Sequence, residues 1–156
     1  MRSKSLCHGV TVVELLLVLA VLAVLSMVAL PRLLEMRSNQ LLAKSASDIV
    51  QALQKAKAKT LGSYNASEYG VYFSSNQIII FKGQNYVPGA SENEITAVPS
   101  PLAISNVALG GISGTTGELY WKRLTGAPSK SGSITLLGSG TSKIITISPA
   151  GSVSSN

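Results

Sequence analysis

An apolar run near the N-terminus is the feature that most constrains this chain. The segment VTVVELLLVLAVLAVLSMVAL fills residues 10–30, and Glu14 is its only ionisable residue. At about 1.5 Å per residue, a helix of this length spans roughly 31 Å, the thickness of a bilayer core. We therefore expect a membrane-inserted helix rather than the core helix of a compact domain.

The charges that flank the run give only a weak indication of which end of the helix faces the cytoplasm. Arg2 and Lys4 precede it, which favours a cytoplasmic N-terminus, but Arg32 and Arg37 follow it closely. The long tail has few charges for a cytoplasmic domain, so we expect a single-pass protein with an exported C-terminal part. A secretory signal cut after Ala23 is the alternative, although its apolar core is usually only about 7–15 residues long.

Composition excludes several kinds of chemistry. Cys7 and His8 are the only residues of their types, and both precede the apolar run. A chain that lost this leader would have no Cys or His nucleophile, no Cys/His zinc site and no intramolecular disulfide. The sequence also has no phosphate loop, dinucleotide fingerprint or G-x-S-x-G motif. We expect a protein that is not an enzyme and that has no metal or cofactor.

The residues around the start of the run resemble a known processing signal. His8-Gly9 followed by VTVVEL is similar to the class III signal of type IV prepilins and type II secretion pseudopilins. That family has a short basic leader, a Gly, an apolar first mature residue, a Glu at the fifth mature position and about twenty apolar residues. Val10 departs from the commoner Phe or Met.

The resemblance implies a division of the N-terminal part and a set of partners. It implies a leader over residues 1–9, cleavage after Gly9 by a prepilin peptidase, and N-methylation of Val10 at the cytoplasmic face of the inner membrane. Residues 10–31 would form the transmembrane and assembly helix, with Pro31 at the position where the family often has a helix-kinking proline. Other pilin or pseudopilin subunits of a filament would be the partners.

Glu14 carries the most specific functional hypothesis. A carboxylate in an apolar helix costs about 2–3 kcal/mol at the bilayer centre and less near an end. Snorkelling to nearby headgroups is the simple interpretation. Cleavage after Gly9 would place an ammonium on Val10, one turn away, and a neighbouring subunit's carboxylate could neutralise it. We therefore expect a role for Glu14 in assembly.

Residues 32–61 have the pattern of an amphipathic helix that continues the apolar one. A proline lacks the amide proton and should kink the helix at Pro31. The apolar positions recur at mostly three- and four-residue steps: Leu34, Leu42, Ala46, Ile49, Leu53 and Ala56. The opposite face carries Arg37, Lys44, Asp48, Lys55 and Lys59.

Residues 62–156 have the pattern of a β-rich head. Short β-branched and aromatic segments predict strands at residues 69–73, 77–82, 118–124, 133–137 and 143–148, with a final short segment after Gly151. Residues 83–117 should be mostly loop with one strand near 102–107, and Gly110, Gly111, Gly114 and Gly117 should lie in a flexible loop. We expect an α+β fold, in which a long N-terminal helix packs on a small antiparallel sheet.

The tail resembles the H-type (FimT-like) group of minor pseudopilins. The resemblance lies in the helix, the strand pair after it and the G-x-I-T-L…K-I-I-T-I-S-x-x-G-x-V pattern from Gly132 to Val153. It implies a pilin fold and a structural, minor filament subunit. Secretion, motility or adhesion, and DNA uptake all remain open as the role of the filament.

A DNA-binding minor pilin for natural transformation is the alternative function. Some FimT-like pilins bind DNA through arginines in a Gly-Arg-x-Arg segment, but the matching stretch, residues 151–154, reads GSVS. Tyr120 and Trp121 beside Lys122 and Arg123 could stack on bases, although burial in a strand explains the aromatic residues as well. We expect no nucleic acid partner.

Two carboxylates in one loop raise the question of a calcium site. Glu92 and Glu94 flank Asn93, but residues 91–94 contain no EF-hand pattern. The simpler interpretation is a solvated loop, and calcium binding there stays an open alternative.

Overall fold

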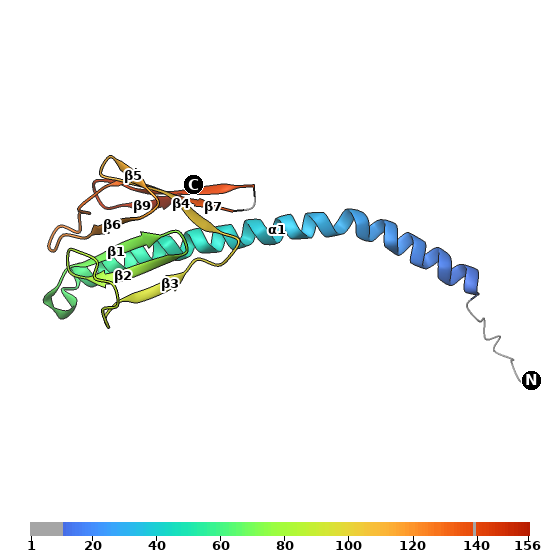
Figure 1. The fold of residues 1–156 in the computed structure, drawn as a ribbon, viewed down its shortest axis with the longest axis horizontal. Coiled ribbons are helices and arrows are strands. Elements are labelled where there is room, and N and C mark those ends of the chain that lie inside the picture. Colours follow the sequence, from blue (N-terminus) through green and yellow to red (C-terminus); the bar gives the residue numbers. More distant parts are fainter. Residues whose placement is uncertain (1–10, 139) are drawn as a thin grey trace, which may run out of the picture. The chain divides into compact units, whose positions relative to one another are not determined.

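The computed structural model describes residues 11–138 and 140–156, and for residues 28–31 and 34 it describes the backbone alone. The described chain is α+β, with a long helix, one turn of 3-10 helix (η1, Tyr64–Ala66) and two antiparallel sheets (Figure 1). It divides into two compact units, Met1–Arg37 and Ser38–Asn156. The α+β class expected from the sequence is confirmed.

The helix α1 runs from Val12 to Leu61 without interruption. One helix that contains both the apolar and the amphipathic segment is therefore present, as the sequence predicted. The helical backbone continues through Pro31, and the kink expected there stays a prediction. The helix ends where the Gly62 amide donates to the Ala58 carbonyl at 2.8 Å.

The first sheet has the strand order β3-β2-β1-β6. A hairpin at its centre joins β1 (Tyr69–Ser74) to β2 (Gln77–Lys82) through the predicted turn at residues 75–76. The strands β3 (Glu94–Ala97) and β6 (Gly117–Tyr120) form its two edges. All three pairings are antiparallel.

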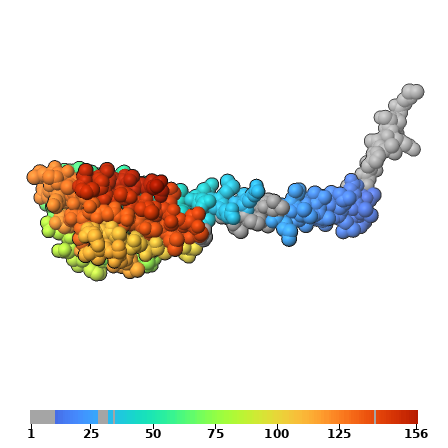
Figure 2. Space-filling view, turned by 90° about the horizontal axis from the view of Figure 1, so that it is seen from above, coloured from blue at the N-terminus to red at the C-terminus, as the bar shows by residue number. Residues whose placement is uncertain are grey.

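The second sheet has the order β5-β4-β7-β8-β9. It consists of β4 (Ala103–Leu109), β5 (Ile112–Gly114), β7 (Gly132–Leu137), β8 (Ser142–Ile147) and β9 (Val153–Ser155). Figure 2 shows the C-terminal strands, coloured orange to red, forming one continuous face of the Ser38–Asn156 unit. The small, Ser- and Gly-rich residues of this region thus form an ordered sheet.

One hydrophobic core joins both sheets to the second half of α1. The helix contributes the predicted row Leu42, Ala46, Ile49, Leu53 and Ala56, each less than 4% exposed. The sheets contribute Val71, Phe73, Ile78, Ile80, Leu119, Ile104, Val107, Leu109, Ile134, Leu136, Ile145 and Ile147. Each large aliphatic side chain buried in this way stabilises the unit by about 1.5–3 kcal/mol.

Three details of the head differ from the sequence predictions. There are two sheets instead of one, since β4 pairs with β7 and not with a strand of the first sheet. The strand expected over residues 118–124 ends at Tyr120, because the chain turns at residues 123–125. The residues expected to be a flexible glycine loop contain a hairpin, in which Gly110 (φ 60°) and Gly111 (φ 83°) form the turn between β4 and β5.

Candidate assembly site

The first turn of α1 is capped by a threonine. The Thr11 hydroxyl oxygen accepts a hydrogen bond from the Glu14 amide at 3.2 Å, and the Thr11 carbonyl accepts one from the Leu15 amide at 3.1 Å. Thr11 and Glu14 thus stand at the two positions of the T-x-x-E capping box. A carboxylate in the first turn also interacts favourably with the helix dipole.

The residues that follow expose apolar side chains around the whole circumference of the helix. Large apolar side chains between residues 12 and 27 are 47–81% exposed. They are Val12, Val13, Leu15, Leu16, Leu17, Val18, Leu19, Val21, Leu22, Val24, Leu25 and Met27. A helix that is apolar on all sides needs an apolar environment, and this surface, residues 12–27, is the candidate assembly site.

The Ser26 hydroxyl, which lies within this apolar surface, has a hydrogen-bond partner in the helix itself. The Ser26 hydroxyl donates to the Leu22 carbonyl at 2.7 Å, one turn earlier. Such a bond removes the cost of placing a hydroxyl in apolar surroundings. The carboxylate of Glu14 is therefore the one strongly polar side chain that an apolar partner would meet between residues 12 and 27.

The predicted site residues fall partly outside the described chain. Gly9 and Val10, the predicted cleavage and methylation positions, lie outside it. Glu14 is exposed in the first helical turn, and Pro31 lies within α1. The sequence interpretation missed that Thr11 caps the backbone amide of Glu14, although the T-x-x-E spacing from Thr11 could have indicated it.

Across the part of the chain described here, the structure has no helix long and apolar enough to cross a membrane.

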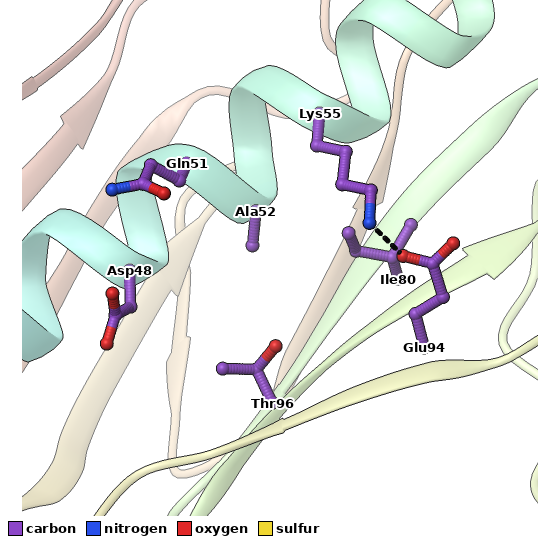
Figure 3. Close-up of a pocket in the computed structure, with 7 residues that line it drawn as sticks. All are labelled: Asp48, Gln51, Ala52, Lys55, Ile80, Glu94 and Thr96. Atoms are coloured by element: carbon purple, nitrogen blue, oxygen red, sulfur yellow. Dashed lines mark hydrogen bonds and ion pairs between the residues drawn. The ribbon is translucent and has the colours of Figure 1, made fainter.

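A second polar feature lies between α1 and the edge strand β3. A surface pocket of about 200 Å³ is lined by Asp48, Gln51, Ala52, Lys55, Ile80, Glu94 and Thr96 (Figure 3). Lys55 donates to the Glu94 carboxylate at 2.6 Å across it, and Lys59 donates to the other carboxylate oxygen. These two bonds, with Lys55 first, lower the pKa of Glu94 below its ordinary value.

Both carboxylates of the predicted solvated loop form ion pairs with lysines. Glu94 opens β3 and pairs with two lysines, and the Glu92 carboxylate accepts from Lys82 at 3.0 Å. The Asn93 side chain donates to the Val87 carbonyl at 2.8 Å. The interpretation of Glu94 as a solvated loop residue is wrong, because its position on the edge strand places it beside α1. Among the described residues, no group of three potential ligands could hold a metal ion.

The aromatic and basic cluster at the end of β6, residues 120–123, does not form a stacking platform. Trp121 is fully buried, and the Lys57 ammonium lies 5.5 Å from its ring centroid. Tyr120 is half-buried, and Lys122 and Arg123 are exposed. Burial of the aromatic residue is the interpretation that the structure supports for Trp121.

Comparison with known proteins yields no match for this chain among protein-family models, curated proteins or solved structures.

Proposed function

We propose that this chain is a structural, minor subunit of a type IV pilus-like or type II secretion pseudopilus filament, processed by a prepilin peptidase. The observation that carries the proposal is the contrast between the two parts of α1. Residues 12–27 expose apolar side chains on every side, whereas positions 42–60 bury a row of side chains in the head's own core. The apolar side chains of residues 12–27 therefore need an apolar surface to pack against, whereas those at positions 42–60 already pack against the two sheets.

The exposed apolar surface supplies the driving force for assembly. Burial of a Val, Leu or Met side chain contributes about 1.5–3 kcal/mol, and twelve such side chains are exposed between residues 12 and 27. Apolar helices of neighbouring subunits would bury this surface. Glu14 would then be placed among apolar side chains and would need a positive partner, for which the Val10 ammonium is our candidate.

The location is a separate part of the proposal. We propose a single-pass inner-membrane protein with an exported head before assembly, and a filament subunit afterwards. The proposal that helices of neighbouring subunits pack together depends only on the exposed apolar surface. It is therefore tested separately from the proposal of a membrane location.

Cysteine crosslinking tests the helix–helix part. Cys7 is the only cysteine, so single cysteines can be placed in a Cys7→Ser background. Val18→Cys and Leu25→Cys, seven residues apart on one face of α1, should each give disulfide-linked dimers in native cells, because a chain with one cysteine forms one disulfide. Ser113→Cys, an exposed position on β5, is the control. Dimers equally abundant with Ser113→Cys, or absent with both helix variants, would contradict the proposal.

Two further measurements test processing and location. The intact mass should correspond to a chain that starts at Val10 and carries one added methyl group. Carbonate extraction of unassembled protein should leave it in the membrane pellet. A chain that keeps Met1 would exclude prepilin processing, and release by carbonate would exclude the bilayer location while leaving the crosslinking result to stand by itself.

A further inference from the structure

The loop between β6 and β7 presents an unusual leucine. Leu124 is 95% exposed, more than any other large hydrophobic side chain in the described chain. Its φ of 70° lies in the left-handed region, which β-carbon-bearing residues other than Asn and Asp rarely adopt. Leu124 is thus both strained and fully presented to solvent.

The turn around Leu124 is closed by three backbone hydrogen bonds. The Thr125 amide donates to the Arg123 carbonyl at 2.9 Å, which makes Leu124 the centre of a γ-turn with positive φ, a rare and strained turn. The Gly126 amide donates to the Lys122 carbonyl at 3.0 Å, and the Lys122 amide donates to the Ala127 carbonyl at 2.9 Å. The strained conformation is therefore enforced by the loop.

Neighbouring segments fix the loop to the head. The Arg123 guanidinium donates to the Ala66 carbonyl at 2.9 Å and to the Ser63 hydroxyl at 3.4 Å. The loop after α1 and the loop after β6 lie at the same end of the Ser38–Asn156 unit (Figure 1). Gly126 is buried and packs closely on the end of α1, since an added β-carbon would lie 3.2 Å from the Leu61 side chain. Leu124 is held at a defined position.

Folding of the head gives no reason for this arrangement. A glycine at position 124 would adopt the same φ without strain, and the leucine side chain removes no apolar surface from water here. Backbone strain that the surrounding structure enforces is characteristic of binding sites. Exposure and strain at one residue therefore both indicate a role in binding.

We propose that Leu124 is a docking residue that inserts into an apolar socket, rimmed by acidic side chains, on another protein. Lys122 and Arg123 are exposed beside it, and the chain that the proposed cleavage leaves, residues 10–156, still has 11 Lys and Arg against 7 Asp and Glu. Charge complementarity therefore selects an acidic partner and disfavours a second copy of this chain. A lipid surface would need no fixed geometry and a larger apolar area. This docking role goes beyond filament assembly through residues 12–27.

Photocrosslinking of the full chain in native cells tests the proposal. The photoreactive amino acid p-benzoylphenylalanine replaces Leu124, and in a second variant it replaces the adjacent, exposed Thr125 in case the first does not fold. Position 112 is the matched control, since Ile112 is also apolar and 76% exposed but carries no positive φ. The crosslinked peptides are identified by mass spectrometry.

The proposal expects crosslinks from the loop to one protein, at an apolar site flanked by Asp or Glu. Lys122→Glu should reduce their yield by about tenfold. Crosslinks to lipid, to a second copy of this chain or to a basic site would overturn the proposal, as would equal yields at position 112, no product, or no effect of Lys122→Glu.

A stability measurement provides an independent readout. Leu124→Gly should abolish docking but raise the thermal unfolding midpoint of the full chain in detergent by a few degrees, because it relieves the strain. A lower midpoint would show that Leu124 serves the fold, and it would overturn the docking role.

Discussion

The Lys55 ammonium reaches across a surface pocket to the Glu94 carboxylate at 2.6 Å and connects the exposed side of α1 to the edge strand β3. Lys59, one turn further along the helix, donates to the same carboxylate. A single edge-strand side chain therefore joins β3 to two lysines of the helix. The pair is partly exposed, so its contribution to stability should be modest.

The pH dependence of stability should report this ion pair. The folded-state pKa of Glu94 lies below its ordinary value of 4.5, so the pair stabilises the fold at neutral pH and the contribution is lost as pH falls through the folded pKa. Glu94→Gln should cost about 1 kcal/mol or less at pH 7 and less than that at pH 3, on the acid side of the ordinary pKa. Urea unfolding of the full chain in detergent at both pH values measures this difference.

The control for this experiment is Glu35→Gln, which removes an exposed carboxylate outside the Ser38–Asn156 unit. It should leave the pH dependence of head unfolding unchanged. An equal loss of stability for Glu94→Gln at pH 7 and pH 3 would mean that the carboxylate charge contributes nothing.

The Thr60 hydroxyl connects the end of α1 to the start of β1. It accepts from the Tyr69 amide at 2.9 Å and donates to the Ala56 carbonyl at 3.0 Å, and Thr60 is 1% exposed. Thr60→Val keeps the shape but leaves a buried amide unpaired, so it should cost about 1–3 kcal/mol. Guanidinium unfolding followed by the fluorescence of Trp121, the chain's only tryptophan, measures the loss.

Thr60→Ser is the matched variant because it keeps the hydroxyl and removes only a methyl group. It should retain most of the stability that Thr60→Val loses. Equal losses for the two variants would assign the effect to packing instead of to the hydrogen bond.

Gly132, at the start of β7, should not tolerate a side chain. Its φ is 154°, and an added β-carbon would overlap the Ala108 carbonyl oxygen of the paired strand β4. Gly132→Ala should therefore cost about 3 kcal/mol or more. Thermal unfolding of the full chain in detergent measures this cost.

Gly111→Ala separates the steric clash from the conformational strain. Gly111 also has a positive φ, but an added β-carbon there would meet nothing within 4 Å. Its substitution should cost about 1–2 kcal/mol through strain alone. If both variants unfold at the same temperature, the close approach of β7 to β4 is not what requires glycine.

Two substitutions of Glu14 separate the side-chain role that the T-x-x-E spacing suggests from the role of its charge. Glutamine can occupy the third helical position of a capping box, whereas alanine cannot replace either function. If the carboxylate neutralises a positive group in an assembly, Glu14→Gln and Glu14→Ala should both reduce crosslinking through Leu25→Cys by about tenfold or more. Processing and head folding should be unchanged.

The capping interpretation makes a different prediction for the same experiment. If Glu14 serves the helix start alone, Glu14→Gln should crosslink like the parent chain. Normal assembly by both variants would leave the carboxylate without a role in subunit contacts.

Local patterns were sufficient to predict the central strands and the helix core. The run QIIIFK follows a Ser-Asn turn, and β2 covers the predicted residues 77–82. The apolar steps from Leu42 to Ala56 predicted the buried helix row. Both patterns depend on neighbouring residues alone, and burial follows directly from them.

The division into two sheets could not be predicted in this way. A strand's own alternation does not specify its partner, so nothing local shows that β4 pairs with β7 while β6 pairs with β1. The strands β3 and β5 were missed because they have only four and three residues and contain the charged Glu94 or a glycine. The contacts of Glu94 depend on that unpredicted strand.

The placement of the shortest strands at the sheet edges has a consequence for heads that lie close together. Each sheet ends in its shortest strands, with four residues in β3 and β6 and three in β5 and β9, while the inner strands have six or seven. Short edge strands offer few free backbone groups for pairing with another chain. Heads can therefore be brought to high local concentration with little risk that their sheets join into amyloid-like ribbons.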